Sequence, residues 1–263
     1  MLYIKKNLPS IDTQNEISKT KRDRHWRTVP EDDVDLRRDI FDQMDKTSIQ
    51  QDLLREQHHL CAYCLRPISN TFEGLRVEHY IPLSEDKEKT LDYTNYLGVC
   101  FGGSEHQEDN EDKKSKAKPV LCCDAQKGSQ RLEAINPLNE DIMDHIAYNP
   151  QGYIYFNGNS MYSDSFCQKA QSDIDNILHL NGLFTKDGDV VTWISDTRTN
   201  IVAGRQNALL AAKKILAKMG PLTSGKIDRA IQSLLDAPRR QPFVGVIIFK
   251  LKQAQALLRS NGQ

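Results

Sequence analysis

Five of the six cysteines in this 263-residue chain lie between positions 61 and 123. Cys61 and Cys64 form a CxxC pair, Cys100 follows, and Cys122 and Cys123 are adjacent. In a reducing compartment, cysteines clustered in this way indicate metal binding rather than disulfides. Zinc takes four thiolate or imidazole ligands in a tetrahedron, commonly as two close pairs. The sequence therefore predicts a structural zinc site, and the fold must bring these distant cysteines together.

Three of the predicted zinc ligands are Cys61, Cys64 and Cys100, and the fourth is either Cys122 or Cys123. We favour Cys123 because it directly precedes the segment Asp124-Ala125-Gln126-Lys127. The alternative is a set of reduced, buried cysteines that hold no metal.

The net charge of −1 conceals an asymmetry along the chain. Residues 198–263 carry twelve Lys or Arg against two acids, a net charge of +10, so the preceding 197 residues carry −11. A basic C-terminal third suits contact with a phosphate backbone. The alternative is that these side chains simply coat solvent-facing helices.

No signal peptide is recognisable in the sequence, because Lys5 and Lys6 follow the first four residues at once. No apolar run approaches the roughly 20 residues that a membrane-spanning helix needs. We therefore expect a cytoplasmic protein with no membrane partner.

The pattern of apolar residues predicts an α+β fold that is mostly helical. Residues 1–30 are expected to be an extended arm with at most one short strand, followed by helices over 31–44 and 48–59. A strand is expected over 75–79 and a turn into a second strand over 92–100, then a polar surface insertion over 101–120 and a helix that Cys123 opens. Beyond a hairpin near 149–156 the chain is expected to be mainly helical, with helices over 174–180, 199–219, 227–235 and 243–258. This gives an N-terminal arm and helix (1–47), a central unit (48–140), and a hairpin with a helical C-terminal region (141–263).

Four polar residues of the central unit, Glu78, His79, Asn95 and Asp124, are not needed by a structural zinc. A neutral imidazole is a natural base for activating water near pH 7. A hard cation such as Mg²⁺ takes oxygen ligands and keeps several waters, so two carboxylates suffice. Neighbouring residues on a strand point to opposite faces, so Glu78 and His79 need a twist or a loop exit to act together. Asn95 is suited to holding a loop or orienting the imidazole.

This order of residues resembles the HNH endonucleases, also called ββα-metal nucleases. The resemblance implies a zinc-supported strand–loop–strand–helix core that grips Mg²⁺ or Mn²⁺ and hydrolyses phosphodiester bonds. It implies that His79 is the general base and that Asn95 fills the central Asn position. It also implies that Glu78 and Asp124 hold the catalytic cation, and that Lys127 matches a basic residue often found one helical turn later.

The chain departs from the HNH pattern at two places. Asp124 stands where the family usually has His or Asn, which adds a negative charge and favours a harder cation. The second cysteine pair is split, because Cys100 and Cys123 are separated by 22 residues rather than two.

Longer motifs narrow the resemblance to the HNH subunit of the Septu antiphage system, including its retron-linked forms. The motifs are CAYC (61–64), VEHYIP (77–82), DYTNYLGVC (92–100), CCDAQKG (122–128), INPL (135–138) and LHLNGLF (178–184). The resemblance implies a partner ATPase of the ABC/SMC type and, in retron-linked forms, a reverse transcriptase with its nucleic-acid product. It also implies a nuclease held inactive until infection.

Two alternatives remain at the level of the sequence. The same chemistry could act on RNA, such as a transfer RNA, rather than on DNA, because their backbone charges are similar. The chain could instead be a zinc-stabilised module that binds nucleic acid or protein without catalysis.

Overall fold

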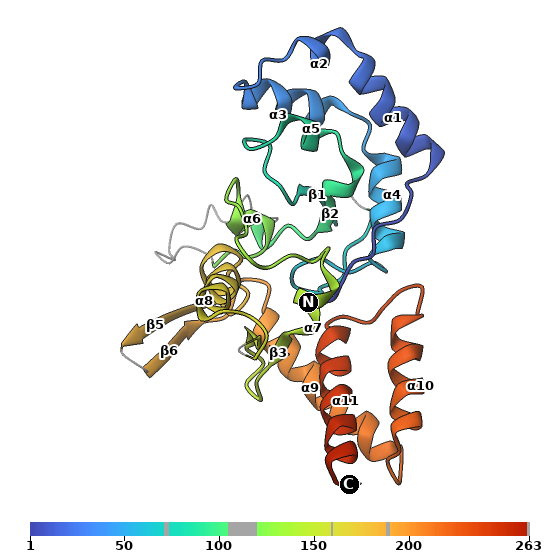
Figure 1. Ribbon diagram of the computed structural model, residues 1–263, viewed down its shortest axis with the longest axis vertical. Helices are drawn as coiled ribbons and strands as arrows, with labels where there is room; N and C mark the ends of the chain where they lie inside the picture. The colour runs from blue at the N-terminus through green and yellow to red at the C-terminus, as the bar shows by residue number, and fades with distance from the viewer. Residues whose placement is uncertain (71–73, 105–119, 159, 188–189, 262–263) are drawn as a thin grey trace, which may run out of the picture.

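The computed structural model describes residues 1–70, 74–104, 120–158, 160–187 and 190–261, and within them the fold is α+β. Among the described residues, three separate two-stranded antiparallel sheets lie between the helices. The N-terminal helices surround the strands β1 (Arg76–His79) and β2 (Tyr96–Val99) at one end of the molecule. The other end is formed by α9 (Ile201–Lys218), α10 (Ser224–Leu235) and α11 (Val244–Asn261) (Figure 1). No helix in the described part of the chain is both long and apolar enough to cross a bilayer.

The expectation of an extended N-terminal arm is wrong, because only about the first ten residues lack helix. The helices here are α1 (Ile11–Arg22), α2 (Arg24–Thr28), α3 (Val34–Gln43) and α4 (Thr47–Glu56). The side chain of Ser10 caps α1 by accepting a hydrogen bond from the Thr13 amide, and basic residues in the last turn suit the helix dipole. Few apolar residues mark the buried face of α1, so the capping residue and the charges at its ends are the sequence features that indicate this helix.

The N-terminal helices enclose a hydrophobic cluster of their own. It joins α1–α4 to the segment that leads into β2, and its buried members are Ile17, Trp26, Val29, Phe41, Met44, Ile49, Leu53, Leu91, Tyr93 and Tyr96. This packing places α3 directly beside the first hairpin, which fixes the position of the helix relative to the central unit.

The central unit contains a hairpin of β1 (Arg76–His79) and β2 (Tyr96–Val99), in which Glu78 pairs with Leu97 and His79 with Tyr96. The connection between the strands holds α5 (Lys87–Thr90) and a 3-10 turn at Tyr93–Asn95. The short helix α6 (Asp124–Lys127) follows. Both strands and the helix lie where the sequence predicts them. The predicted insertion over 101–120 lies largely outside the described residues.

The second half begins with α7 (Glu140–Asp144) and the predicted hairpin, formed by β3 (Ile146–Tyr148) and β4 (Ile154–Phe156). The helix α8 (Asp164–Ser172) continues as a π-helical turn over Asp173–Ile177. A third hairpin, β5 (Leu183–Asp187) with β6 (Val190–Ser195), lies between two predicted helices, in a segment for which the sequence predicted no element of its own. The residues from Val190 to Ile194 are all β-branched or aromatic. This composition favours a strand here, between the helices on either side.

The three C-terminal helices predicted from the sequence are confirmed as α9 (Ile201–Lys218), α10 (Ser224–Leu235) and α11 (Val244–Asn261). Their apolar faces join the largest hydrophobic cluster, which also contains five of the cysteines. The buried guanidinium of Arg205 on α9 donates hydrogen bonds to the Gly152 carbonyl and the Asn181 side chain. The cysteine region and the C-terminal helices therefore share one core.

Candidate metal centre and active-site cleft

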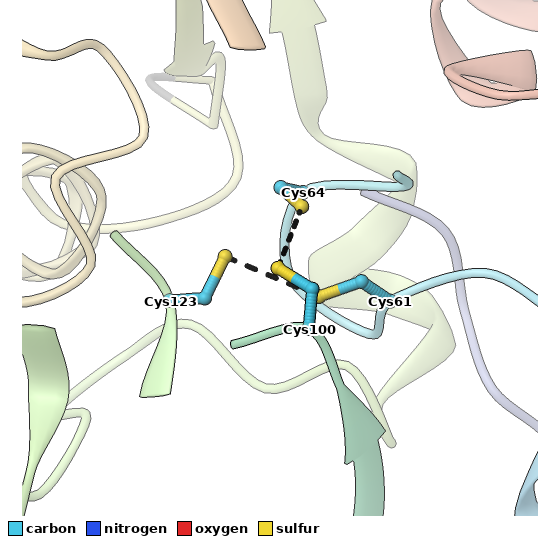
Figure 2. A group of neighbouring side chains, drawn as sticks. All are labelled: Cys61, Cys64, Cys100 and Cys123. Atoms are coloured by element: carbon cyan, nitrogen blue, oxygen red, sulfur yellow. Dashed lines mark hydrogen bonds between the residues drawn. The ribbon is translucent and has the colours of Figure 1, made fainter. Parts of the chain in front are cut away.

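The thiols of Cys61, Cys64, Cys100 and Cys123 converge in the main core (Figure 2). All four are buried, and their sulfur atoms lie within 4.8 Å of one another. The Cys64–Cys100 sulfur separation is 3.6 Å and the Cys61–Cys123 separation is 4.0 Å. A tetrahedral zinc with Zn–S bonds of about 2.3 Å would hold its sulfurs about 3.8 Å apart. The four thiols therefore fit a structural metal such as zinc.

The backbone around the first cysteine pair forms a tight knuckle. The Cys61 amide donates to the Arg66 carbonyl over 2.8 Å, and the Leu65 amide donates to the Cys61 carbonyl over 3.1 Å. The Ala62 amide donates to the Gly98 carbonyl of β2 over 3.0 Å. The knuckle is thus attached to the strand that leads into Cys100, which brings three of the thiols together.

Cys123, rather than Cys122, completes the thiol cluster. The Cys122 sulfur lies 3.5 Å from the Thr199 hydroxyl and 3.7 Å from the Gly102 carbonyl. Gly102 has a positive φ of 62°, and an added Cβ would lie 1.9 Å from the Cys122 carbonyl oxygen. A side chain at position 102 would clash with the Cys122 backbone, so the close approach of these two segments, between Cys100 and the last two cysteines, requires glycine at this position.

A cleft of about 640 Å³ opens beside the thiol cluster, between α3, β1 and α6. It is lined by Glu78 and His79 at the end of β1, and by Asp124 and Lys127 of α6. Although Glu78 and His79 are neighbours, both reach the cleft, because β1 ends at His79 and the chain turns away there. Cys123 directly precedes α6, so the thiol cluster sets where Asp124 and Lys127 lie.

His79 is 7% exposed and its imidazole is held on several sides. The Nε2 atom lies 3.0 Å from the Thr90 carbonyl oxygen, and because a carbonyl only accepts, Nε2 carries the proton. Ring centroids of Phe41 and Tyr96 lie 4.5 and 5.1 Å from the imidazole. Burial lowers the pKa of His79 to about 4, so the ring is neutral near pH 7. A neutral ring protonated on Nε2 leaves the Nδ1 lone pair as a proton acceptor.

Glu78 lies at the centre of a buried network of charges. Its carboxylate pairs with the Lys127 ammonium at 2.7 Å and accepts a hydrogen bond from the Tyr63 hydroxyl at 3.1 Å. Burial raises the pKa of Glu78 to about 8; Lys127 opposes this rise, while Asp124, within hydrogen-bonding reach, adds to it. Asp124 in turn lies 3.6 Å from the Arg76 guanidinium. Tyr63 and Arg76 were not identified from the sequence, because only the folded chain brings them to Glu78 and Asp124.

The carboxylates of Glu78 and Asp124 are the right donor type for Mg²⁺ or Mn²⁺. When ionised, they are already paired with the cations of Lys127 and Arg76. A divalent cation bound between the carboxylates would have to compete with the Lys127 ammonium for Glu78. The donor set therefore fits a hard cation that is held loosely, with Asp124 as the more accessible ligand.

Asn95 is 3% exposed and its side chain contacts the loop after β1 rather than the imidazole. Its amide nitrogen donates to the carbonyls of Ile81 and Lys89, each over 3.0 Å, and its amide oxygen accepts from the Ile81 backbone over 2.7 Å. Lys89 precedes Thr90, whose carbonyl orients His79. Asn95 thus positions the imidazole through the backbone, which makes it a positioning residue rather than a catalytic one.

Replacing Asn95 with alanine should reveal this positioning role. The change removes three hydrogen bonds and leaves partly buried backbone groups of Ile81 and Lys89 unpaired, so we expect a loss of about 2 to 4 kcal/mol in the free energy of unfolding. Urea unfolding of the variant measures the loss. Unchanged stability would contradict the assigned contacts, and the exposed Asn176→Ala variant provides a control.

The raised pKa of Glu78 predicts how stability depends on pH. The folded protein binds this proton more tightly than the unfolded chain, whose carboxyl has a pKa near 4.5. The stabilising contribution of Glu78 is therefore complete below about pH 4.5 and is lost as the pH rises toward 8. Relative to Glu78→Gln, the parent should lose stability between pH 5 and pH 8 in urea unfolding. A stability difference that stays constant across this range would refute the prediction.

No protein-family model matches this chain, and no curated protein matches it either. The function of the cleft must therefore be inferred from its own residues and from their resemblance to known motifs.

Proposed function

We propose that this protein is a metal-dependent nuclease of the HNH type. One observation carries the proposal: a buried neutral imidazole and two carboxylates from separate segments line a single cleft beside a cluster of four thiols. The thiol cluster alone does not require His79, Glu78 or Asp124. Their placement at one cleft suits hydrolysis of a phosphodiester bond.

In this proposal His79 is the general base. Its Nδ1 atom takes a proton from water, and the water oxygen forms a bond to phosphorus as the bond from phosphorus to the 3′ oxygen breaks. The Thr90 carbonyl holds the ring by accepting a hydrogen bond from Nε2–H. The expected products carry 5′-phosphate and 3′-hydroxyl ends.

Asp124 and Glu78 would hold the catalytic cation. Mg²⁺ or Mn²⁺, when bound, supplies positive charge that stabilises the phosphate and the departing oxygen. Lys127 and Arg76 would offset the like charges of the two carboxylates when both are ionised. The four thiols would hold a structural zinc that fixes α6 against β1.

We favour DNA as the substrate, with RNA as the alternative. Exposed basic residues on α9–α11 are available to contact a nucleic-acid backbone or a partner protein. On the motif resemblance we further propose that the chain is the effector of a Septu-type antiphage complex with an ABC/SMC-type ATPase. A retron reverse transcriptase and its product are additional candidate partners. Co-purification from cells that express the neighbouring genes tests this assembly.

The direct test of the proposed activity is cleavage of DNA and RNA by the purified chain, alone and with any co-purifying proteins. Cutting should require added Mg²⁺ or Mn²⁺, and should fall strongly in Asp124→Asn. Metal-free buffer is preferable to a strong chelator, because a chelator would also remove structural zinc. Nucleic acid that is bound but never cut would favour the rival function, a non-catalytic zinc-stabilised binding module.

A further inference from the structure

The cleft has a wall that lies outside the strand–loop–strand–helix segment. Residues Val34, Arg38 and Asp42 of α3 line it opposite β1 and α6. This wall is attached firmly, because the buried guanidinium of Arg37 donates to the backbone carbonyls of Glu31 and Leu83. Leu83 belongs to the loop that follows His79. The helix therefore cannot move far relative to the imidazole without breaking these buried contacts.

Arg38 lies on the same face of α3 as the residue that touches His79. The Phe41 ring packs against the imidazole with 4.5 Å between centroids, and Arg38 precedes Phe41 by three residues, nearly one helical turn. Residues three apart on a helix are neighbours on one face, about 4.5 Å apart along the axis. The backbone thus presents Arg38 to the cleft about one turn from the imidazole.

The charges lining the cleft are nearly all paired. Lys127 pairs with Glu78, Arg76 lies 3.6 Å from Asp124, and Asp42 lies 3.3 Å from Lys46, the residue that precedes α4. Arg38 is exposed, and no described residue forms a hydrogen bond or ion pair with its guanidinium. Among the described residues that line the cleft, Arg38 is therefore the cation whose charge is left uncompensated.

We propose that Arg38 is a substrate-binding residue that contacts a nucleic-acid phosphate at, or next to, the bond to be cut. This inference rests on the proposed nuclease function and deepens it, because it assigns a phosphate subsite to α3. A guanidinium suits the role, since it stays charged and can donate two parallel hydrogen bonds to phosphate oxygens. The nearby carboxylate of Asp42 repels phosphate, so it should weaken binding at the same wall.

The test measures nucleic-acid binding without cleavage, in a His79→Ala background without added divalent cation. Fluorescence anisotropy with a labelled oligonucleotide gives Kd across a range of salt concentrations. In Arg38→Gln we expect Kd to rise about threefold to tenfold at low salt, and the slope of log K against log salt to fall by about one. Asp42→Asn should change Kd in the opposite direction. The control is Arg27→Gln on α2, an exposed arginine outside the cleft.

An Arg38→Gln variant with the same Kd and salt slope as its His79→Ala parent would overturn the inference, even if the protein with His79 intact cuts nucleic acid normally. Equal losses in Arg38→Gln and Arg27→Gln would also overturn it, because they would indicate diffuse attraction rather than a subsite. If the protein with His79 intact binds nucleic acid but does not cut it, while Arg38→Gln still binds more weakly than its parent, the nuclease proposal is refuted and the phosphate subsite stands.

Discussion

Replacing His79 with alanine should lower the rate of phosphodiester cleavage by about 10²- to 10⁴-fold, the usual contribution of a general base. The side chain is buried against Phe41 and Tyr96, so the variant should also lose some stability. Single-turnover cleavage at a temperature where both proteins are folded separates the two effects. Added imidazole should restore part of the rate by entering the vacated space. His25→Ala, a change at an exposed histidine on α2, should cut as fast as the parent.

The protonation state of His79 provides a check that does not depend on activity. Because burial lowers its pKa to about 4, the ring should stay neutral as the pH falls from 8 to 5. An ordinary histidine, with a pKa near 6.5, would gain its proton in that range. NMR titration of the ring resonances distinguishes the two cases. A midpoint near pH 6.5 would mean that the imidazole is not enclosed in the way described here.

Replacing any one thiol of the buried cluster, for example Cys61→Ser or Cys123→Ser, should remove the structural metal and most of the folded state. Structural zinc contributes apparent free energies of about 10 to 16 kcal/mol in isolated zinc-finger peptides, which exceeds the whole stability of many domains. We therefore expect about one zinc per chain in the parent and far less in these variants, together with loss of cooperative thermal unfolding.

Cys122→Ser is the matched control for the cysteine variants. The Cys122 sulfur is buried and lies only 3.8 Å from that of Cys123, but it is outside the cluster of four thiols. The variant should keep its zinc and unfold cooperatively. Zinc loss in Cys122→Ser combined with zinc retention in Cys123→Ser would show that the fourth ligand has been assigned wrongly.

Cysteine spacing and apolar periodicity predicted much of the framework. The four thiols follow from cysteine chemistry, and α9, α10 and α11 follow from apolar residues at helical spacing. The helix α1 was not predicted, because its buried face is carried by few apolar residues and its signals are a serine cap and terminal charges. The hairpin of β5 and β6 was not predicted, because the residues that favour a strand form a short segment between helices.

Only part of the candidate site could be predicted from the sequence. Glu78, His79 and Asp124 could be selected from the sequence because hydrolytic chemistry needs an imidazole and carboxylates. The Lys127–Glu78 ion pair joins residues 49 positions apart, and only the folded chain reveals that it is buried. The contact between Phe41 and His79 places α3 at the site, although no sequence motif identifies this helix as part of it. These tertiary contacts set the charge balance of the cleft, which determines how firmly it can hold a cation or a phosphate.

Cleavage in water enriched in ¹⁸O tests the central claim most directly, because it follows the attacking oxygen. If water activated by His79 attacks phosphorus, a single turnover should place one heavy oxygen on the new 5′-phosphate and none on the 3′-hydroxyl. Mass spectrometry of the product ends measures this. Products that lack the label, such as 2′,3′-cyclic phosphate ends on RNA, or intact nucleic acid after incubation with Mg²⁺ or Mn²⁺, would contradict the account.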